Sequence, residues 1–149
     1  MSRPPTVDVA ALLDAARAVR GNAYAPYSGF TVGAAIALDD GSVVTGANVE
    51  NASYGLSLCA EAVALATAHA SGAMRHAVAI AVVGDSAARP TGVAVTPCGR
   101  CRQMLVEAEH AAGRPLPIHS APAGAVGTEG LVSYNLADLL PHAFGPGSL

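Results

Sequence analysis

A run of consecutive apolar residues, from Ala77 to Val83 (AVAIAVV), restricts the folds open to this chain. A strand with one exposed face alternates apolar and polar residues, and this run does not alternate. We therefore expect a strand that is buried on both faces and lies at the centre of a sheet. Such a strand needs helices packed on both sides of the sheet, which predicts an α/β fold.

The segments on either side of this run supply the other elements. Residues 30–38 (FTVGAAIAL) and 42–49 (SVVTGANV) flank Asp39-Asp40-Gly41-Ser42 and predict a β-hairpin, because an Asp-Gly pair favours a tight turn between β-prone runs. Residues 84–96 are mostly loop, with room for one short strand at residues 93–95. Helices are expected at residues 7–20, 57–72, 99–112 and 135–140, and a further strand at residues 116–121 (LPIHSA).

Several residues are typical of helix ends. Thr6 and Ser57 are expected to cap the first two helices, and Gly21 to end the first helix in the left-handed conformation. Asn135 and Asp138 have the spacing of a capping box at the start of the last helix. Together these elements predict a mixed sheet with helices on its faces.

Composition limits the classes of partner. A chain of 149 residues with 52% hydrophobic residues predicts a single domain over residues 1–149. A net charge of −3 with only eight Lys and Arg argues against a nucleic-acid partner and favours a small, neutral ligand. The first ten residues, MSRPPTVDVA, lack the apolar core of a signal peptide, and no apolar run approaches membrane-spanning length. We therefore expect a cytoplasmic protein with no membrane partner.

The cysteines of the chain are Cys59, Cys98 and Cys101. An odd number of cysteines in a reducing compartment argues against a disulfide framework. All three fall at the start of a predicted helix, where the helix dipole favours a thiolate. Three thiolates with one open position describe a catalytic zinc site. The alternative is that Cys59 is a small core residue and that Cys98 and Cys101 form an isolated pair.

Glu61 stands two residues after Cys59, on a helix otherwise rich in Ala, Val and Leu. A carboxylate at this position is poorly suited to a core, which favours a chemical role, although a solvated helix glutamate is the simpler alternative. The histidines lack ligand spacing to one another or to the cysteines, so none is expected to bind the metal. They are His69, His76, His110, His119 and His142.

The motif C-A-E followed by P-C-x-x-C matches the signature of zinc-dependent nucleoside and nucleobase deaminases, in which the glutamate transfers protons and is not a ligand. Beyond this signature, the sequence closely resembles the small homotetrameric cytidine deaminases. The resemblance runs through YAPYSGFTVGAA, TGANVENASYGL, CAE, PCGRCRQ and LLPHAFGP, which together span most of the chain. It implies a three-layer α/β/α fold with a mixed sheet of about five strands.

The resemblance also implies roles for individual residues. Cys59, Cys98 and Cys101 would hold one zinc ion per subunit, and Glu61 would be the catalytic acid and base. Phe30 would stack on the pyrimidine ring, Asn48 and Glu50 would bind the ribose hydroxyls, the backbone of Ala60 would contact the base, and Ala52, Tyr54 and Phe144 would complete the pocket of a neighbouring subunit. For Asn48 and Glu50 a role in turn formation stays open, as does core packing for Phe144.

The implied reaction is the zinc-dependent hydrolytic deamination of cytidine and deoxycytidine to uridine and deoxyuridine, with release of ammonia, in pyrimidine salvage. One position departs from the family pattern, because Ala62 stands where many members carry an arginine that offsets the charge of the zinc thiolates. Arg102, in the CRQ motif, is the candidate to replace it, ahead of Arg100. An interface or surface role for Arg102 is equally open.

Three rival functions remain at this point. An aminonucleoside-antibiotic deaminase of the blasticidin type would share CGRCRQ and the Ala62-Val63 continuation of CAE, but NVENASY argues against it. A polynucleotide deaminase would need a basic stripe that this acidic chain lacks. A non-catalytic zinc-stabilised binding module would tolerate the loss of Glu61.

Overall fold

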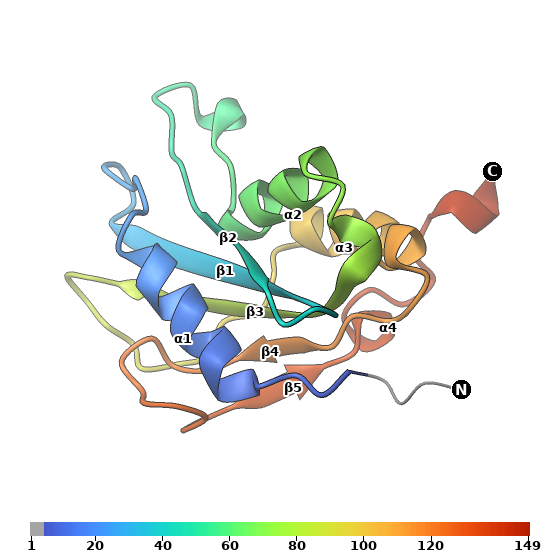
Figure 1. Ribbon diagram of the computed structural model, residues 1–149. Helices are drawn as coiled ribbons and strands as arrows, with labels where there is room; N and C mark the ends of the chain where they lie inside the picture. Colours follow the sequence, from blue (N-terminus) through green and yellow to red (C-terminus); the bar gives the residue numbers. More distant parts are fainter. Residues whose placement is uncertain (1–4) are drawn as a thin grey trace.

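The fold is a five-stranded mixed sheet covered by helices on both faces (Figure 1). It is seen in a computed structural model that describes residues 5–149. The helices are α1 (Val9–Arg20), α2 (Ala60–Ala70), α3 (Gly99–Ala112) and α4 (Leu136–Leu139), and the strands are β1 (Phe30–Leu38), β2 (Val43–Ala47), β3 (Ala77–Ser86), β4 (Ile118–Ser120) and β5 (Val132–Tyr134).

The strands follow the order β2-β1-β3-β4-β5, so the apolar run from Ala77 to Val83 lies at the centre, as predicted. β1 pairs antiparallel with both β2 and β3, β3 is parallel to β4, and β4 is antiparallel to β5. The β1–β2 hairpin is confirmed, and Gly41 in its turn has a φ of 87°, which a residue with a Cβ rarely adopts. β3 continues to Ser86, past the predicted end.

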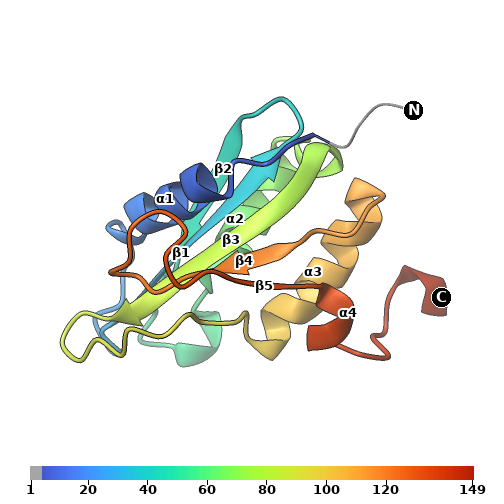
Figure 2. The ribbon, with the colours of Figure 1, turned by 90° about the horizontal axis from the view of Figure 1, so that it is seen from below.

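The helices form two layers, with α1 on one face of the sheet and α2 and α3 on the other (Figure 2). Alternate residues of β1 serve the two cores, because Ala35 packs with Leu13 of α1 whereas Ile36 packs with Leu65 of α2. Glycines let the helices approach closely. A Cβ at Gly33 would collide with the backbone of α1, and one at Gly46 would collide with the backbone of α2. The predicted three-layer α/β/α arrangement is confirmed.

The predicted helix caps are wrong in detail. α1 is capped by Asp8, whose Oδ1 accepts a hydrogen bond from the backbone N–H of Ala11 at 3.0 Å, and not by Thr6. Aspartate is the stronger capping residue of the two, so the helix begins at the later site. Gly21 follows α1 in the right-handed conformation, with a φ of −59°. The residue that caps α2 is Cys59 rather than Ser57.

The region after α3 differs from the prediction in two further ways. β5 was not predicted, because it is a three-residue edge strand that is largely exposed and carries little apolar pattern. Asn135 does precede α4, but its side chain makes no capping hydrogen bond. Residues 93–95, where a short strand had room to form, belong to no helix or strand. Within residues 5–149, no helix has both the length and the apolar character needed to cross a membrane.

Candidate active site

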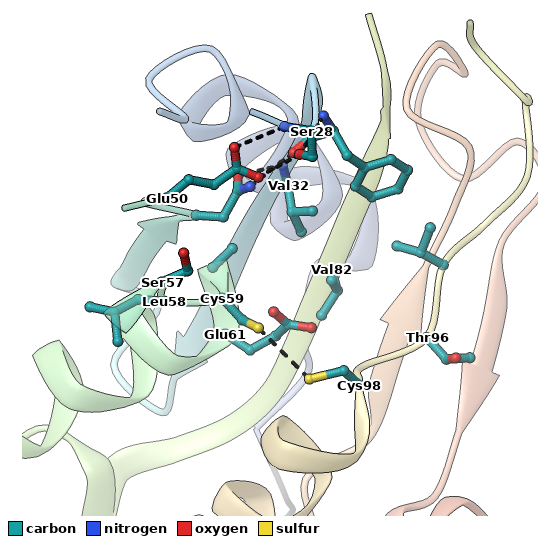
Figure 3. Close-up of a pocket in the computed structure, with 14 residues that line it drawn as sticks. Ser28, Val32, Glu50, Ser57, Leu58, Cys59, Glu61, Val82, Thr96 and Cys98 are labelled. Atoms are coloured by element: carbon teal, nitrogen blue, oxygen red, sulfur yellow. Dashed lines mark hydrogen bonds between the residues drawn. The ribbon is translucent and has the colours of Figure 1, made fainter. Parts of the chain in front are cut away.

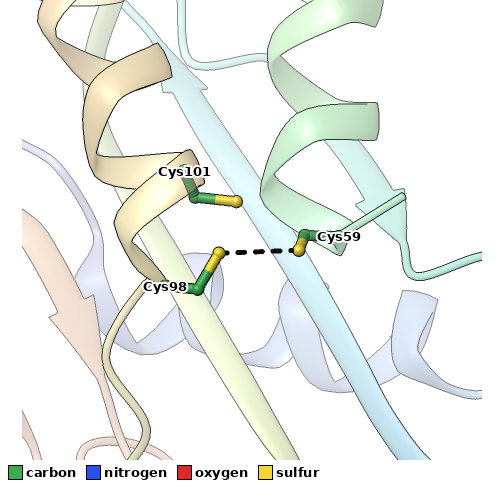
Figure 4. Close-up of side chains that lie close together, drawn as sticks. All are labelled: Cys59, Cys98 and Cys101. Carbon is green, nitrogen blue, oxygen red and sulfur yellow. Dashed lines mark hydrogen bonds between the residues drawn. The ribbon is translucent and has the colours of Figure 1, made fainter. Parts of the chain in front are cut away.

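The cysteines meet where α2 and α3 begin side by side (Figure 4). Cys59 caps α2, Cys98 caps α3, and Cys101 lies in the first turn of α3. The Sγ atoms of Cys59 and Cys98 are 3.7 Å apart, and all three Sγ atoms lie within 4.8 Å of one another. The alternative of a core cysteine and a separate pair is therefore wrong.

The three sulfurs fit a zinc ion. Tetrahedral coordination at a Zn–S distance of about 2.3 Å places neighbouring sulfurs about 3.8 Å apart, close to the separation of Cys59 and Cys98. Cys101 is buried, Cys59 is partly buried and Cys98 is exposed, so the cluster is closed on the side of the core and open on the other. Because three protein ligands meet here among residues 5–149, a fourth position would remain for water or substrate.

The charges of the thiols point to the same conclusion. The pKa of the Cys59 thiol is lowered to about 6, chiefly by the side chain of Cys101, with smaller contributions from Cys98 and the positive charge of Arg100, although burial raises it. The pKa of Cys101 is raised, first by Cys59 and then by burial. The thiolate of Cys59 thus forms readily, and its negative charge opposes the ionisation of Cys101. A divalent cation bound at the cluster would offset this repulsion and favour both thiolates.

Glu61 lies in the first turn of α2 and lines a pocket of about 330 Å³ with Cys59 and Cys98 (Figure 3). The residue is only 5% exposed, so the alternative of a solvated glutamate is wrong. Burial raises the pKa of its carboxyl to about 7, with a further contribution from the negative charge of Cys59, while a backbone hydrogen bond and Cys101 oppose the shift. A buried carboxylate beside a metal site is suited to proton transfer.

The rest of the pocket combines an apolar wall with polar groups at one side. Phe30, Asn48, Glu50 and Ala60, all predicted from the sequence, line it. The sequence prediction missed further lining residues, which are Ser28, Val32, Ser57, Leu58, Val82, Val95 and Thr96. Ser28 stands inside the YAPYSGF motif, so a signal for it was present. For Val82 and Val95 the sequence holds no such signal. Val82 lies within the buried strand β3, and Val95 lies in the loop that follows it.

Asn48 and Glu50 bind the protein itself. The Oδ1 atom of Asn48 accepts a hydrogen bond from the N–H of Val32 at 2.8 Å, and its Nδ2 donates to the carbonyl of Phe30 at 2.9 Å. The Oε1 atom of Glu50 accepts hydrogen bonds from the backbone N–H groups of Tyr27 and Ser28, at 2.9 and 3.1 Å. The local structural role left open for both residues therefore exists, and both also face the pocket.

Ala52, Tyr54 and Phe144 are not among the described residues that line this pocket. All three are exposed, Tyr54 to 74% and Phe144 to 63%. Core packing of Phe144 within its own chain is therefore wrong. Tyr54 contacts Tyr27 edge to face, with ring centroids 5.8 Å apart, beside a second hollow that shares Ser28 and Glu50 with the pocket.

The hydrogen bonds of Arg102 go to groups other than the thiols. Its Nε and one terminal nitrogen donate to the carbonyl oxygens of Pro97 and Leu139, each at 2.8 Å, and its other terminal nitrogen donates to Thr96 at 3.2 Å. Within residues 5–149 these hydrogen bonds give Arg102 no thiol partner, and its candidate role beside the thiolates stays a prediction without support from these contacts. Arg100 donates instead to the carbonyl oxygen of Ser57 at 3.2 Å, and its charge lowers the pKa of Cys59.

Known proteins share this arrangement of sequence and fold. The family described as "Cytidine and deoxycytidylate deaminase zinc-binding region" matches residues 7–112. This chain belongs to that deaminase family. The matched region contains Glu61 and the three cysteines, and zinc is the cofactor of the family.

Individual deaminases are similar over most of their length. The cytidine deaminase of Mycobacterium tuberculosis is 43% identical over 141 residues, which cover 95% of this chain and 92% of the relative. That of Halalkalibacterium halodurans is 54% identical over 96 residues, covering 64% and 68%. The crystal structure of cytidine deaminase from Burkholderia pseudomallei superposes with a TM-score of 0.76 at 43% identity, covering 90% of this chain and 97% of that one.

Proposed function

We propose that this protein is a zinc-dependent cytidine deaminase, which converts cytidine and deoxycytidine to uridine and deoxyuridine and releases ammonia. The observation that carries the proposal is the convergence of three cysteine sulfurs and the buried carboxylate of Glu61 at one pocket. Its close relatives bear the name cytidine deaminase. A role in cytoplasmic pyrimidine salvage is part of this proposal, as the family resemblance implies.

Each catalytic group has a distinct task. Zinc held by Cys59, Cys98 and Cys101 would act as a Lewis acid and lower the pKa of a water molecule. Glu61 accepts a proton from the attacking water and delivers it to N3 of the ring. It then takes the second proton from the hydroxyl group formed at C4 and delivers it to the departing amino group, so that ammonia leaves and the C4 carbonyl of uridine forms. Its position in the first turn of α2, two residues after Cys59, puts Glu61 in the same pocket as the thiols and would hold its carboxylate near the reacting carbon of a bound base.

The apolar wall of the pocket suits a flat, uncharged base. Phe30, Val32 and Val82 offer this wall, and Phe30 stacks on the pyrimidine ring. The backbone of Ala60 contacts the base edge. The carboxylate of Glu50 accepts hydrogen bonds from the sugar hydroxyls, and the side-chain amide of Asn48 forms hydrogen bonds with them.

We also propose that the active unit is a homotetramer with sites shared between subunits. Ala52, Tyr54 and Phe144 are exposed in the single chain, and aromatic side chains such as those of Tyr54 and Phe144 are enriched at protein interfaces. In the tetramer they would complete the pocket of a neighbouring subunit.

Ammonia release from a panel of substrates tests the proposal. Cytidine and deoxycytidine are expected to be turned over, whereas CMP, free cytosine and blasticidin S are expected to be poor substrates. Faster turnover of blasticidin S would favour the antibiotic deaminase, and no ammonia from any compound, with zinc bound at full stoichiometry, would favour the non-catalytic zinc module.

A further inference from the structure

Ser28 connects two parts of the pocket that the proposed function treats as separate. Its Oγ donates a hydrogen bond to Oε2 of Glu50 and accepts one from the backbone N–H of Phe30 at 3.0 Å. The labels in Figure 3 show Ser28 beside Glu50 at the rim of the pocket, above Val32. One hydroxyl therefore joins the residue proposed to bind the sugar to the residue proposed to stack on the base.

The carboxylate of Glu50 is fixed at both of its oxygens. Oε1 accepts from the N–H groups of Tyr27 and Ser28, and Oε2 accepts from the Ser28 hydroxyl. A carboxylate offers about four acceptor sites, so a lone pair remains for a ligand that donates. A carboxylate fixed in this way can accept a hydrogen bond from a sugar hydroxyl. It makes no such bond to a sugar that lacks the hydroxyl, so that sugar should bind more weakly.

Phe30 is held from both sides of its backbone. Its N–H donates to Ser28, and its carbonyl accepts from Nδ2 of Asn48 at 2.9 Å. These two bonds fix the start of β1, where the aromatic ring enters the pocket. Loss of the Ser28 hydroxyl would remove the hydrogen bond to Oε2 of Glu50, whereas the carbonyl of Phe30 would keep its hydrogen bond from Asn48.

We propose that Ser28 is a positioning residue for sugar recognition, which holds the Glu50 carboxylate in the geometry that selects nucleosides with free sugar hydroxyls. This inference rests on the proposed function, because it assumes that a nucleoside occupies the pocket. Ser28 acts through Glu50 and takes no part in the reaction at the base.

The ionisation of Glu50 agrees with this role. Its pKa is lowered, first by the hydrogen bond from the Ser28 side chain and then by that from the Ser28 backbone. Glu50 is thus held as an acceptor, and removing the hydroxyl removes the largest single cause of the shift.

Calorimetry with two product-like ligands tests the inference without relying on turnover. Uridine and 2′,3′-dideoxyuridine are titrated into the zinc-loaded wild type and into Ser28→Ala, Ser28→Thr and Ser71→Ala. Ser71→Ala is the matched control, because the Ser71 hydroxyl is also a hydrogen-bond donor, to the carbonyl of Thr67 at 2.9 Å, but lies at the far end of α2. Ser28→Ala is expected to weaken uridine binding about tenfold and to leave dideoxyuridine nearly unchanged.

The remaining variants complete the test. Ser28→Thr keeps a hydroxyl and should restore the preference for uridine, and Ser71→Ala should match the wild type. In a Glu50→Gln background, Ser28→Ala should change the preference no further, because the two residues act as one unit. If Ser28→Ala lowers the melting temperature, Ser28→Cys, with a weaker donor of similar size, is used in its place.

Two results would overturn the inference. One is an equal loss of affinity for both ligands in Ser28→Ala, which would mark a general structural role. The other is an undiminished preference for uridine in that variant. Failure of the proposed function itself would look different, because the wild type would then bind neither ligand.

Discussion

The Sγ atoms of Cys59 and Cys98 lie 3.7 Å apart although the residues are separated by 39 positions and cap different helices. A metal at this point would link α2 to α3 across the face of the sheet. Ligand binding to the folded state alone stabilises that state, by about 2.7 kcal/mol when the free ligand is at 100 times its dissociation constant. Zinc is therefore expected to contribute to stability as well as to chemistry.

Cys98→Ala should lose zinc and unfold at a lower urea concentration than the wild type, because one ligand and the link between helices are removed. Zinc content is measured by atomic absorption. A chelator should bring the wild type to the stability of the variant and leave the variant unchanged. Stoichiometric zinc in Cys98→Ala would show that Cys98 is not a ligand.

Glu61→Gln should retain zinc while turnover of cytidine falls by about a thousandfold or more, because the amide cannot accept and deliver the proton. Glu107→Gln is the control, since Glu107 is exposed on α3 and should be silent in both measurements. Loss of zinc from Glu61→Gln would contradict its assignment as a residue that does not bind the metal.

Phe144→Ala should weaken nucleoside binding more than zinc binding, because an aromatic side chain of a shared pocket is removed while the thiols are untouched. Leu149→Ala is the control, as Leu149 is 99% exposed at the end of the chain.

Sedimentation should give four times the chain mass of 14.7 kDa for the active wild type. Full activity at the monomer mass would end the proposal of a shared site.

Asp85→Asn should flatten the loss of stability at acid pH. Asp85 is 3% exposed, and its pKa is lowered, first by the backbone N–H of Thr91 and then by that of Gly92. A carboxyl whose pKa is lower in the folded state stabilises the protein above its unfolded pKa of about 3.9, and this contribution is lost as the pH falls through the folded value. Urea unfolding at pH 3 to 7 measures the effect, and parallel curves for the two proteins would contradict it.

The elements that the sequence predicted well are those with strong local signals. The Asp-Gly turn at Gly41 and the unbroken apolar run of β3 each allow few alternatives, and both were confirmed. The capping residues were not, because Thr6 and Asp8 both suit a cap and differ by only about 1 kcal/mol or less in that role. β5 is three residues at an edge, with no periodic pattern to detect.

The candidate site divides in the same way. The cysteines and Glu61 stand out as residue types at a characteristic spacing, and the structure brings them together. The direction of a long side chain depends on acceptors far along the chain, which spacing does not reveal. Arg102 shows this, since one of its acceptors is the carbonyl of Leu139, 37 residues away.

The charge of the thiolates poses the last question, because three thiolates on a divalent cation leave a net charge of −1 and weaken zinc as a Lewis acid. Ala62 supplies no cation to offset this charge. The helix N-termini offset part of it, and Arg100 is the side chain whose charge reaches Cys59. Arg102 instead ties the segment before α3 to the end of α4.

Arg100→Gln and Arg102→Gln should therefore separate the two effects. Arg100→Gln should speed zinc loss to a chelator by about two- to fivefold, the range expected for an exposed ion pair, and raise the pH at which activity appears, while stability changes little. Added salt should narrow its difference from the wild type, because Arg100 is exposed and its field is screened. Arg102→Gln should lower the free energy of unfolding by about 1–3 kcal/mol, since it leaves partly buried carbonyls without a donor, and should keep the pH–rate profile of the wild type. A shifted profile in Arg102→Gln with an unchanged one in Arg100→Gln would reverse the assignment.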